Sequence, residues 1–261
     1  MSTRWRILDL VDYTGAIDTK TGRVVINSQE VVMSDVACVL TGDGTKWSGS
    51  FVQLMAKFDI PILACDWRGV PVAATLPWSD NTRVGARHQA QASQSLPRQK
   101  NAWTRIVKAK IEGQANNLEL GSTQRDRLES MIPKVRSGDA GNSEASAART
   151  YWSCLFKPEK FTRNRDLGGR NALLNYGYAI VRGGVIRAVA VAGLAPALGI
   201  YHRNRSNTFA LADDLMEPFR PVIDSFVKEL PANADLTDRS VKARLVSVLA
   251  EPISGYGETV L

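Results

Sequence analysis

Four side chains in the second half of the chain are of the types that hold a divalent cation. His202 follows an apolar stretch, and Glu217 comes fifteen residues later, with Asp214 three residues before it. Residues three apart on a helix lie on one face, so these two carboxylates can converge. Glu144 lies upstream, among small residues at the start of an expected helix. Carboxylate oxygens suit magnesium or manganese, and an imidazole nitrogen favours manganese. Such a cation can polarise a phosphodiester and stabilise its transition state.

Each of these residues also has an ordinary structural role that spacing alone does not exclude. A single histidine is often a surface or hydrogen-bonded residue. Asp214 and Glu217 also fit a solvated helix face, and Glu144 fits a helix N-terminus, where the macrodipole favours an acidic side chain. The residue types therefore permit a metal site with an open coordination position, but they do not require one.

The chain lacks the motifs of several other enzyme classes. It has two histidines in all, His88 and His202, and no Gly-x-Ser-x-Gly elbow, which disfavours serine hydrolase chemistry. It has neither a Gly-x-x-x-x-Gly-Lys-Ser/Thr loop nor a glycine fingerprint for a dinucleotide. His88 fits a helix surface or a phosphate contact better than catalysis. The three cysteines form no Cys-x-x-Cys pair, and their odd number argues against a disulfide framework.

Positive charge is distributed unevenly along the chain. Residues 1–80 carry a net charge of −2, whereas residues 81–261 carry +9. A basic region of this kind is typical of proteins that bind a polyanion, most commonly nucleic acid. Guanidinium groups pair well with phosphate oxygens, although they pair equally well with acidic side chains. The candidate DNA-binding arginines are three in one polar loop and two beside His202: Arg163, Arg165, Arg170, Arg203 and Arg205.

The pattern of apolar residues predicts an α+β protein with two domains. Residues 1–77 contain β-branched runs and one amphipathic helix at 48–58, which predicts a small β-rich, sandwich-like domain. Residues 78–86 predict a linker, and residues 87–261 predict a larger all-α catalytic domain. The expected strands span 5–8, 23–26, 30–33, 36–40, 61–65 and 70–76. The expected helices span 87–96, 100–117, 123–135, 143–156 (capped by Asn142 or Ser143), 171–192, 207–230 (interrupted at Pro218) and 238–249.

No apolar run is long enough to span a bilayer, and the richest one, 185–200, is broken by Arg187, Gly193 and Pro196. The first residues lack the apolar core of a signal peptide. The sequence therefore predicts a cytoplasmic protein with no membrane partner.

Four segments, in this order, resemble the CRISPR-associated integrase family, the nuclease subunit of the spacer-acquisition complex. The first is 48–69, a helix followed by Asp-Ile-Pro, a buried strand and Asp-Trp-Arg-Gly. The second is the long helix that contains 106–115, and the third is Glu144-Ala-Ser-Ala-Ala-Arg-Thr-Tyr-Trp. The fourth combines 172–178, His202-Arg203 and the run 214–221, which most resembles type II members. The resemblance covers nearly the whole chain.

The resemblance implies a β-rich domain, a helical catalytic domain and a homodimer, with two dimers flanking a dimer of the smaller CRISPR-associated acquisition protein in a heterohexamer. It implies that Glu144, His202 and Glu217 bind magnesium or manganese and carry catalysis, with Asp214 as an accessory acid. The implied reaction is attack by a protospacer 3′-hydroxyl on a phosphodiester at a CRISPR repeat boundary. The implied partner is double-stranded DNA, both protospacer and repeat. A non-catalytic DNA-binding scaffold and a structure-selective DNA-repair endonuclease remain alternatives.

Overall fold

The computed structural model describes residues 6–67, 71–77 and 84–250. Its contacts divide the chain into two compact units. The first takes the described residues up to His88 together with Ala179–Ala195 and residues 249–250, and the second takes Gln89–Tyr178 and Pro196–Val248. The predicted boundaries had placed 179–195 with the helical region. Most of the predicted linker, 78–83, lies outside the described residues.

The larger sheet of the first unit is mostly parallel. β1 (Arg6–Leu10), β6 (Val36–Thr41) and β8 (Ile62–Cys65) run parallel side by side, and β9 (Pro71–Thr75) pairs antiparallel with β8. A second, antiparallel sheet joins β3 (Asp18–Lys20), β4 (Arg23–Ile26) and β5 (Gln29–Val32). β2 (Gly15–Ala16) and β7 (Thr45–Lys46) form a short parallel pair.

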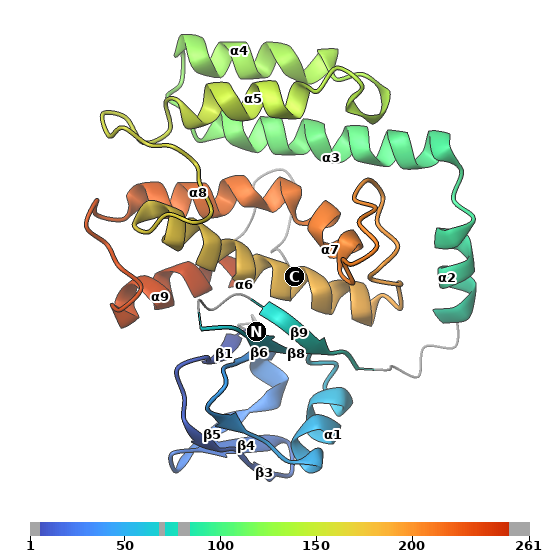
Figure 1. Ribbon diagram of the computed structural model, residues 1–261, viewed down its shortest axis with the longest axis vertical. Coiled ribbons are helices and arrows are strands. Elements are labelled where there is room, and N and C mark those ends of the chain that lie inside the picture. Colours follow the sequence, from blue (N-terminus) through green and yellow to red (C-terminus); the bar gives the residue numbers. More distant parts are fainter. Residues whose placement is uncertain (1–5, 68–70, 78–83, 251–261) are drawn as a thin grey trace. The chain divides into compact units, whose positions relative to one another are not determined.

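The core of the first unit is built from both sheets and one helix. α1 (Gly49–Lys57), drawn in light blue in Figure 1, is amphipathic, and its buried residues join those of the strands in one cluster. Alternate residues of a strand point to opposite faces, so each strand contributes only part of its apolar set to this cluster. The cluster includes Val24 and Ile26 from β4, Val39 from β6, Ile62 from β8, and Phe51 and Met55 from α1.

The opposite face of the larger sheet is covered by the second half of α6 (Arg170–Val191). A Cβ added at Gly183 would lie 3.1 Å from Leu63 Cδ1 and 3.2 Å from Cys38 Sγ. Burial raises the pKa of the Cys38 thiol far above its usual range and that of Cys65 to about 12. The three cysteines are free, and Cys38 and Cys65 are buried in β6 and β8.

The second unit is helical, and its longest helix, α3 (Leu96–Asn116), packs against α4 (Thr123–Met131), α5 (Ser143–Trp152), α7 (Ala210–Leu215) and α8 (Arg220–Glu229) (Figure 1). Residues one turn apart on α3, namely Trp103, Val107 and Ile111, are buried and form its inner face. α2 (Val84–Ala92) crosses the division between the units, and α9 (Arg239–Val246) contacts α8. The 3₁₀ turns are η1 (Met33–Asp35), η2 (Ile132–Lys134), η3 (Ser137–Asp139), η4 (Glu217–Phe219) and η5 (Ser247–Ala250).

The predicted α+β class, with strands first and helices after them, is confirmed. The strand predicted at 23–26 coincides with β4, whereas β2, β3 and β7 were missed because they are only two or three residues long. The helix predicted at 207–230 is three pieces, α7, η4 and α8, because Pro218 cannot donate a backbone hydrogen bond. Among the described residues, no helix has the length and apolar character needed to cross a membrane.

Gly177→Ala is expected to lower the free energy of unfolding by about 1–3 kcal/mol, the usual cost of overpacking a core. An added Cβ would lie 2.5 Å from Ile223 Cγ2 and 3.2 Å from its Cδ1. Gly85→Ala is the matched control, because its helical position has no atom within 4 Å of the added Cβ. Urea unfolding measures both variants, and equal stability of Gly177→Ala and the wild type would contradict this close helix contact.

Candidate metal and phosphate site

Glu144 lies in the first turn of α5, and a side chain from the preceding turn fixes its backbone. The two carboxylate oxygens of Asp139 accept hydrogen bonds from the backbone N–H groups of Ser143 (2.8 Å) and Glu144 (3.0 Å). This arrangement corrects the predicted cap. Asn142 occupies the N-cap position with a φ of 52°, but its side chain makes no capping bond. Asp139 can satisfy the free N–H groups because η3 brings it back over the helix end.

Asp214 is fully buried in α7 and accepts hydrogen bonds from a loop that folds over it. Its Oδ2 accepts from the backbone N–H groups of Ile200 (2.5 Å) and Tyr201 (2.8 Å), and its Oδ1 accepts from that of His202 (3.2 Å). The loop can approach this closely because residue 199 is glycine. A Cβ there would lie 2.5 Å from the His202 carbonyl oxygen and 3.0 Å from Asp214 Oδ2.

The same carboxylate orients the imidazole of His202. Nδ1 lies 2.5 Å from Asp214 Oδ1. An ionised carboxylate can only accept, so Nδ1 donates and Nε2 is the ring nitrogen left for a ligand. Tyr201 stacks on Trp103 with 4.2 Å between ring centroids and 4° between planes, and the His202 ring lies edge-on to Trp103 at 5.9 Å. The imidazole is therefore held by the hydrogen bond to Asp214 and by the edge-on contact with the ring of Trp103.

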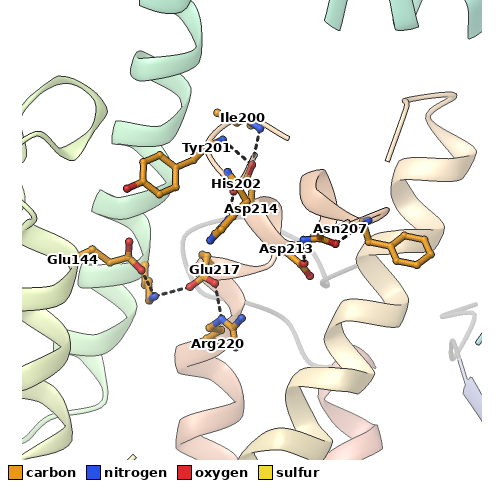
Figure 2. Close-up of polar contacts among 11 residues, drawn as sticks. Glu144, Ile200, Tyr201, His202, Asn207, Asp213, Asp214, Glu217 and Arg220 are labelled. Carbon is orange, nitrogen blue, oxygen red and sulfur yellow. Dashed lines mark hydrogen bonds and ion pairs between the residues drawn. The ribbon is translucent and has the colours of Figure 1, made fainter. Parts of the chain in front are cut away.

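Glu144 and Glu217 meet at a single cationic group. Lys110 Nζ, from α3, lies 2.6 Å from Glu144 Oε1 and 2.5 Å from Glu217 Oε2. Figure 2 shows dashed lines from both carboxylates running to that one nitrogen, while Arg220 reaches Glu217 from the other side. Arg220 Nε lies 2.8 Å from Glu217 Oε1. The side chains of Lys110 and Glu217 are only 13% and 8% exposed, so this ion-pair chain is largely withdrawn from water.

These contacts shift the pKa values of the site in definite directions. Burial raises the pKa of Glu217, but the positive charges of Arg220 and Lys110 outweigh it, and the net shift is downward. The hydrogen bond to Asp214 raises the pKa of His202, burial opposes it, and the charge of Glu217 adds to the rise. Both shifts follow from opposite charges in a partly dehydrated environment.

The residues fit a divalent cation in donor type, and two of them, Glu144 and Glu217, converge. Nδ1 of His202 is held by the carboxylate of Asp214, and a carboxylate commonly holds the far ring nitrogen of a metal-bound histidine in this way. As they stand, no three histidine, cysteine, aspartate or glutamate side chains among the described residues are grouped to hold a metal ion. The ammonium of Lys110 occupies the point where Glu144 and Glu217 meet. Ligation by Glu144, His202 and Glu217 therefore stays a prediction.

The predicted DNA-binding arginines fall into two groups. Arg163 donates to the side-chain oxygens of Asn171 and Asn175, and Arg170 pairs with both carboxylate oxygens of Glu159. These two arginines are committed to contacts within the protein. Arg165, Arg203 and Arg205 are exposed, and of these Arg203 donates one hydrogen bond, to the side-chain oxygen of Gln99. Arg203 and Arg205 also line an open cavity of about 320 Å³ together with His202, Gln99 and Asn204.

Sequence reasoning missed Lys110, Arg220 and Asp139 as site residues. Lys110 carried a usable signal, because it is three residues after Val107 and seven after Trp103. That spacing puts a lysine on the buried face of an amphipathic helix, where a charge needs a partner. Arg220 and Asp139 carried no comparable signal, since acidic and basic residues near helix ends are common.

Solved structures with this fold include DNA-integrating and CRISPR-associated proteins. A casposase bound to integration product matches with a TM-score of 0.72 at 18% identity, covering 98% of this chain and 85% of that one. A Cas6-RT-Cas1–Cas2 complex matches with a TM-score of 0.74 at 18% identity, covering 99% of this chain and 33% of the matched chain. At these identities the likeness establishes the fold alone.

Sequence comparison establishes the family. The model of the CRISPR associated protein Cas1 family matches residues 10–251, so this chain belongs to the Cas1 family. A CRISPR-associated endonuclease Cas1 from Neisseria meningitidis serogroup C (strain 8013) is 35% identical over 263 residues, covering 96% of this chain and 84% of the relative.

A buried hydrogen-bond network lies behind the site and contacts Arg220. Asp224 accepts hydrogen bonds from the hydroxyl groups of Tyr151 (3.0 Å) and Tyr178. Arg220 lies over the ring of Tyr178, 4.5 Å from its centroid, and Asn117 donates to the Tyr151 hydroxyl at 2.8 Å. Burial raises the pKa of Asp224 to about 7, and the hydrogen bonds from the two tyrosines only partly offset that rise.

The pKa of Asp224 predicts that stability decreases with pH in the range below neutrality. The folded protein holds this proton up to about pH 7, whereas an unfolded aspartate releases it near its usual value of 3.8. The resulting stability is present below about pH 4 and lost as pH rises toward 7, by as much as about 4 kcal/mol. Asp224→Asn cannot titrate, so its free energy of unfolding, measured in urea, should lack this slope. Asp126→Asn, at an exposed position, is the control and should keep the pH dependence of the wild type. If the unfolding free energies of the wild type and Asp224→Asn change in parallel with pH, the raised pKa of Asp224 is refuted.

Proposed function

We propose that this chain is a metal-dependent DNA integrase and endonuclease that inserts protospacer DNA into a CRISPR array. The observation that carries the proposal is the convergence of Glu144 and Glu217 on one cationic point beside an oriented His202. Family membership supports the same activity, because the relative from Neisseria meningitidis is named as an endonuclease. The casposase structure, described as bound to integration product, supports strand transfer on this fold.

In the proposed site, Glu144, Glu217 and Nε2 of His202 hold magnesium or manganese. A cation held by these residues would supply Lewis-acid activation of the phosphodiester for attack by a 3′-hydroxyl, or by water in the nuclease reaction. Asp214 keeps the proton of His202 on Nδ1 and the ring in a fixed orientation. Arg220 balances part of the negative charge of Glu217 and keeps that carboxylate in one position. The chain thereby prearranges negative ligands before DNA arrives, which spares reorganisation in the transition state.

DNA is proposed to approach from the exposed cavity beside His202. Arg203 and Arg205 line this cavity, and guanidinium groups there would contact backbone phosphates on either side of the reacting one. Arg165 is the third exposed candidate. Arg163 and Arg170 take no direct part in this proposal, because acidic and amide side chains already occupy their guanidinium groups.

The proposed assembly is a homodimer that joins a smaller acquisition protein in a heterohexamer. The Cas6-RT-Cas1–Cas2 complex supports this partner, because a related fold occurs there together with Cas2. A requirement for the second protein would separate an integrase from a free-standing DNA-repair nuclease. Binding of DNA without any strand transfer by the wild type would favour a scaffold.

Glu144→Gln and His202→Ala are each expected to lower strand transfer by at least about 100-fold, since each removes a proposed metal ligand. The assay uses a repeat-containing plasmid, a labelled protospacer, manganese and the smaller acquisition protein. Duplex binding should change by less than about twofold, because phosphate contacts dominate affinity. Glu119→Gln, at an exposed position of the same unit, is the matched control and should retain activity. If both Glu144→Gln and His202→Ala integrate DNA at the wild-type rate, the proposed metal site is ruled out.

Arg205→Gln is expected to weaken DNA binding. It should also reduce the slope of log Kd against log salt concentration by about one, which is the effect of losing one phosphate contact. Arg170→Gln serves as the opposite case, because Arg170 pairs with Glu159 and donates to the carbonyl of Val227. It should lower the melting temperature while leaving the salt slope unchanged. Fluorescence anisotropy at several salt concentrations measures both, and the reverse pattern would contradict the division of the arginines.

A further inference from the structure

The position of Lys110 sets a condition on metal binding at this site. Its ammonium lies 2.6 Å from one carboxylate and 2.5 Å from the other, between the two acidic groups that would hold the cation. An ammonium and a divalent cation both need these oxygens, and at such short separations they repel each other strongly. The two cations therefore cannot occupy the point between Glu144 and Glu217 together.

Of the two basic residues at the site, Lys110 is the one that can leave. Arg220 lies over the ring of Tyr178 at 4.5 Å, and its planar guanidinium contacts Oε1 of Glu217. Lys110 has a flexible four-carbon stem, and its ammonium carries three rotatable donors. Its backbone is fixed, because Val107, Ile111 and Gln114 around it on α3 are buried. The ammonium can therefore move while its point of attachment stays in place.

We propose that Lys110 is a tethered competitor of the metal ion, which holds Glu144 and Glu217 together in the metal-free protein and is displaced when the metal binds. The displaced ammonium then contacts a phosphate oxygen of the DNA, since its two carboxylate partners are no longer available. Lys110 thus links occupation of the metal site to binding of the phosphate. This inference rests on the proposed function, because it takes Glu144 and Glu217 as metal ligands.

The exchange has a thermodynamic consequence that can be measured without catalysis. The apparent metal affinity equals the intrinsic affinity multiplied by the fraction of time that the carboxylates are free of Lys110. If that fraction is about one tenth, then Lys110→Met should bind manganese about tenfold more tightly than the wild type. Metal-free Lys110→Met loses the cation between two carboxylates, so it should melt at a lower temperature. Saturating manganese should raise its melting temperature more than it raises that of the wild type.

The experiment titrates manganese into full-length wild type, Lys110→Met, Lys108→Met and Glu144→Gln, with calorimetry and thermal melting as readouts. Lys108→Met, on the same helix, is the matched control and should bind manganese as the wild type does. Manganese binding by the wild type that is lost in Glu144→Gln establishes the metal site independently of Lys110. Absence of binding to the wild type would instead overturn the metal site of the proposed function.

Unchanged or weaker manganese binding by Lys110→Met, with the wild type and Lys108→Met behaving alike, would overturn the exchange and leave Lys110 as a structural ion pair. If Lys110→Met fails to fold without metal, recovery of its folded circular dichroism signal in manganese supports the exchange. Failure of both Lys110→Met and Lys110→Gln to recover that signal contradicts it.

Strand transfer is a second measurement, and it tests the contact between the displaced ammonium and the DNA. At saturating manganese Lys110→Met should react at least about tenfold more slowly if the ammonium contacts the phosphate. An unchanged rate of strand transfer in Lys110→Met would contradict the proposed contact between the displaced ammonium and the phosphate.

Discussion

The helical unit depends on the compensation of buried negative charge. Glu217 is 8% exposed and Asp214 is fully buried, and an ionised carboxylate in such a place is strongly unfavourable unless it is paired or hydrogen-bonded. The protein solves the problem in two different ways. Asp214 is satisfied by backbone N–H groups and an imidazole, whereas Glu217 is satisfied by two cations, Lys110 and Arg220. The first solution is permanent, and the second contains one partner that can be exchanged.

Close backbone approach makes both solutions geometrically possible. Gly199 lets the loop reach Asp214, and Gly113 lets α3 approach Pro221, whose Cγ would lie 3.1 Å from an added Cβ. This approach brings Lys110, one turn earlier on α3, up to the η4 turn that carries Glu217. Three elements far apart in sequence thus deliver their charged groups to one place because small residues remove the side chains that would separate them. Close packing of the backbone is therefore a precondition for the contacts among the charged side chains of the site.

The sequence predicted the elements better than it predicted the contacts within them. Hydrophobic periodicity located α1, α3 and β4 because buried faces repeat at fixed intervals, and these intervals are local properties. The two-residue strands β2 and β7 were not predictable, since their pairing is decided by residues some thirty positions away. The candidate residues Glu144, Asp214 and Glu217 could be selected by type and spacing. The partner that joins two of them, Lys110, could be found only by treating a lysine on a buried helix face as a paired charge.

The different roles of Asp214 and Glu217 show why spacing alone could not finish the assignment. Three residues apart on one continuous helix, they would present two similar carboxylates to the same face. Pro218 prevents this, because α7 ends at Leu215 and Glu217 opens the η4 turn. The break turns Glu217 toward Lys110 and leaves Asp214 beneath the loop that carries His202. One carboxylate consequently orients the imidazole and the other faces the cation. That division of roles comes from a helix break, and a helical projection of the sequence does not contain it.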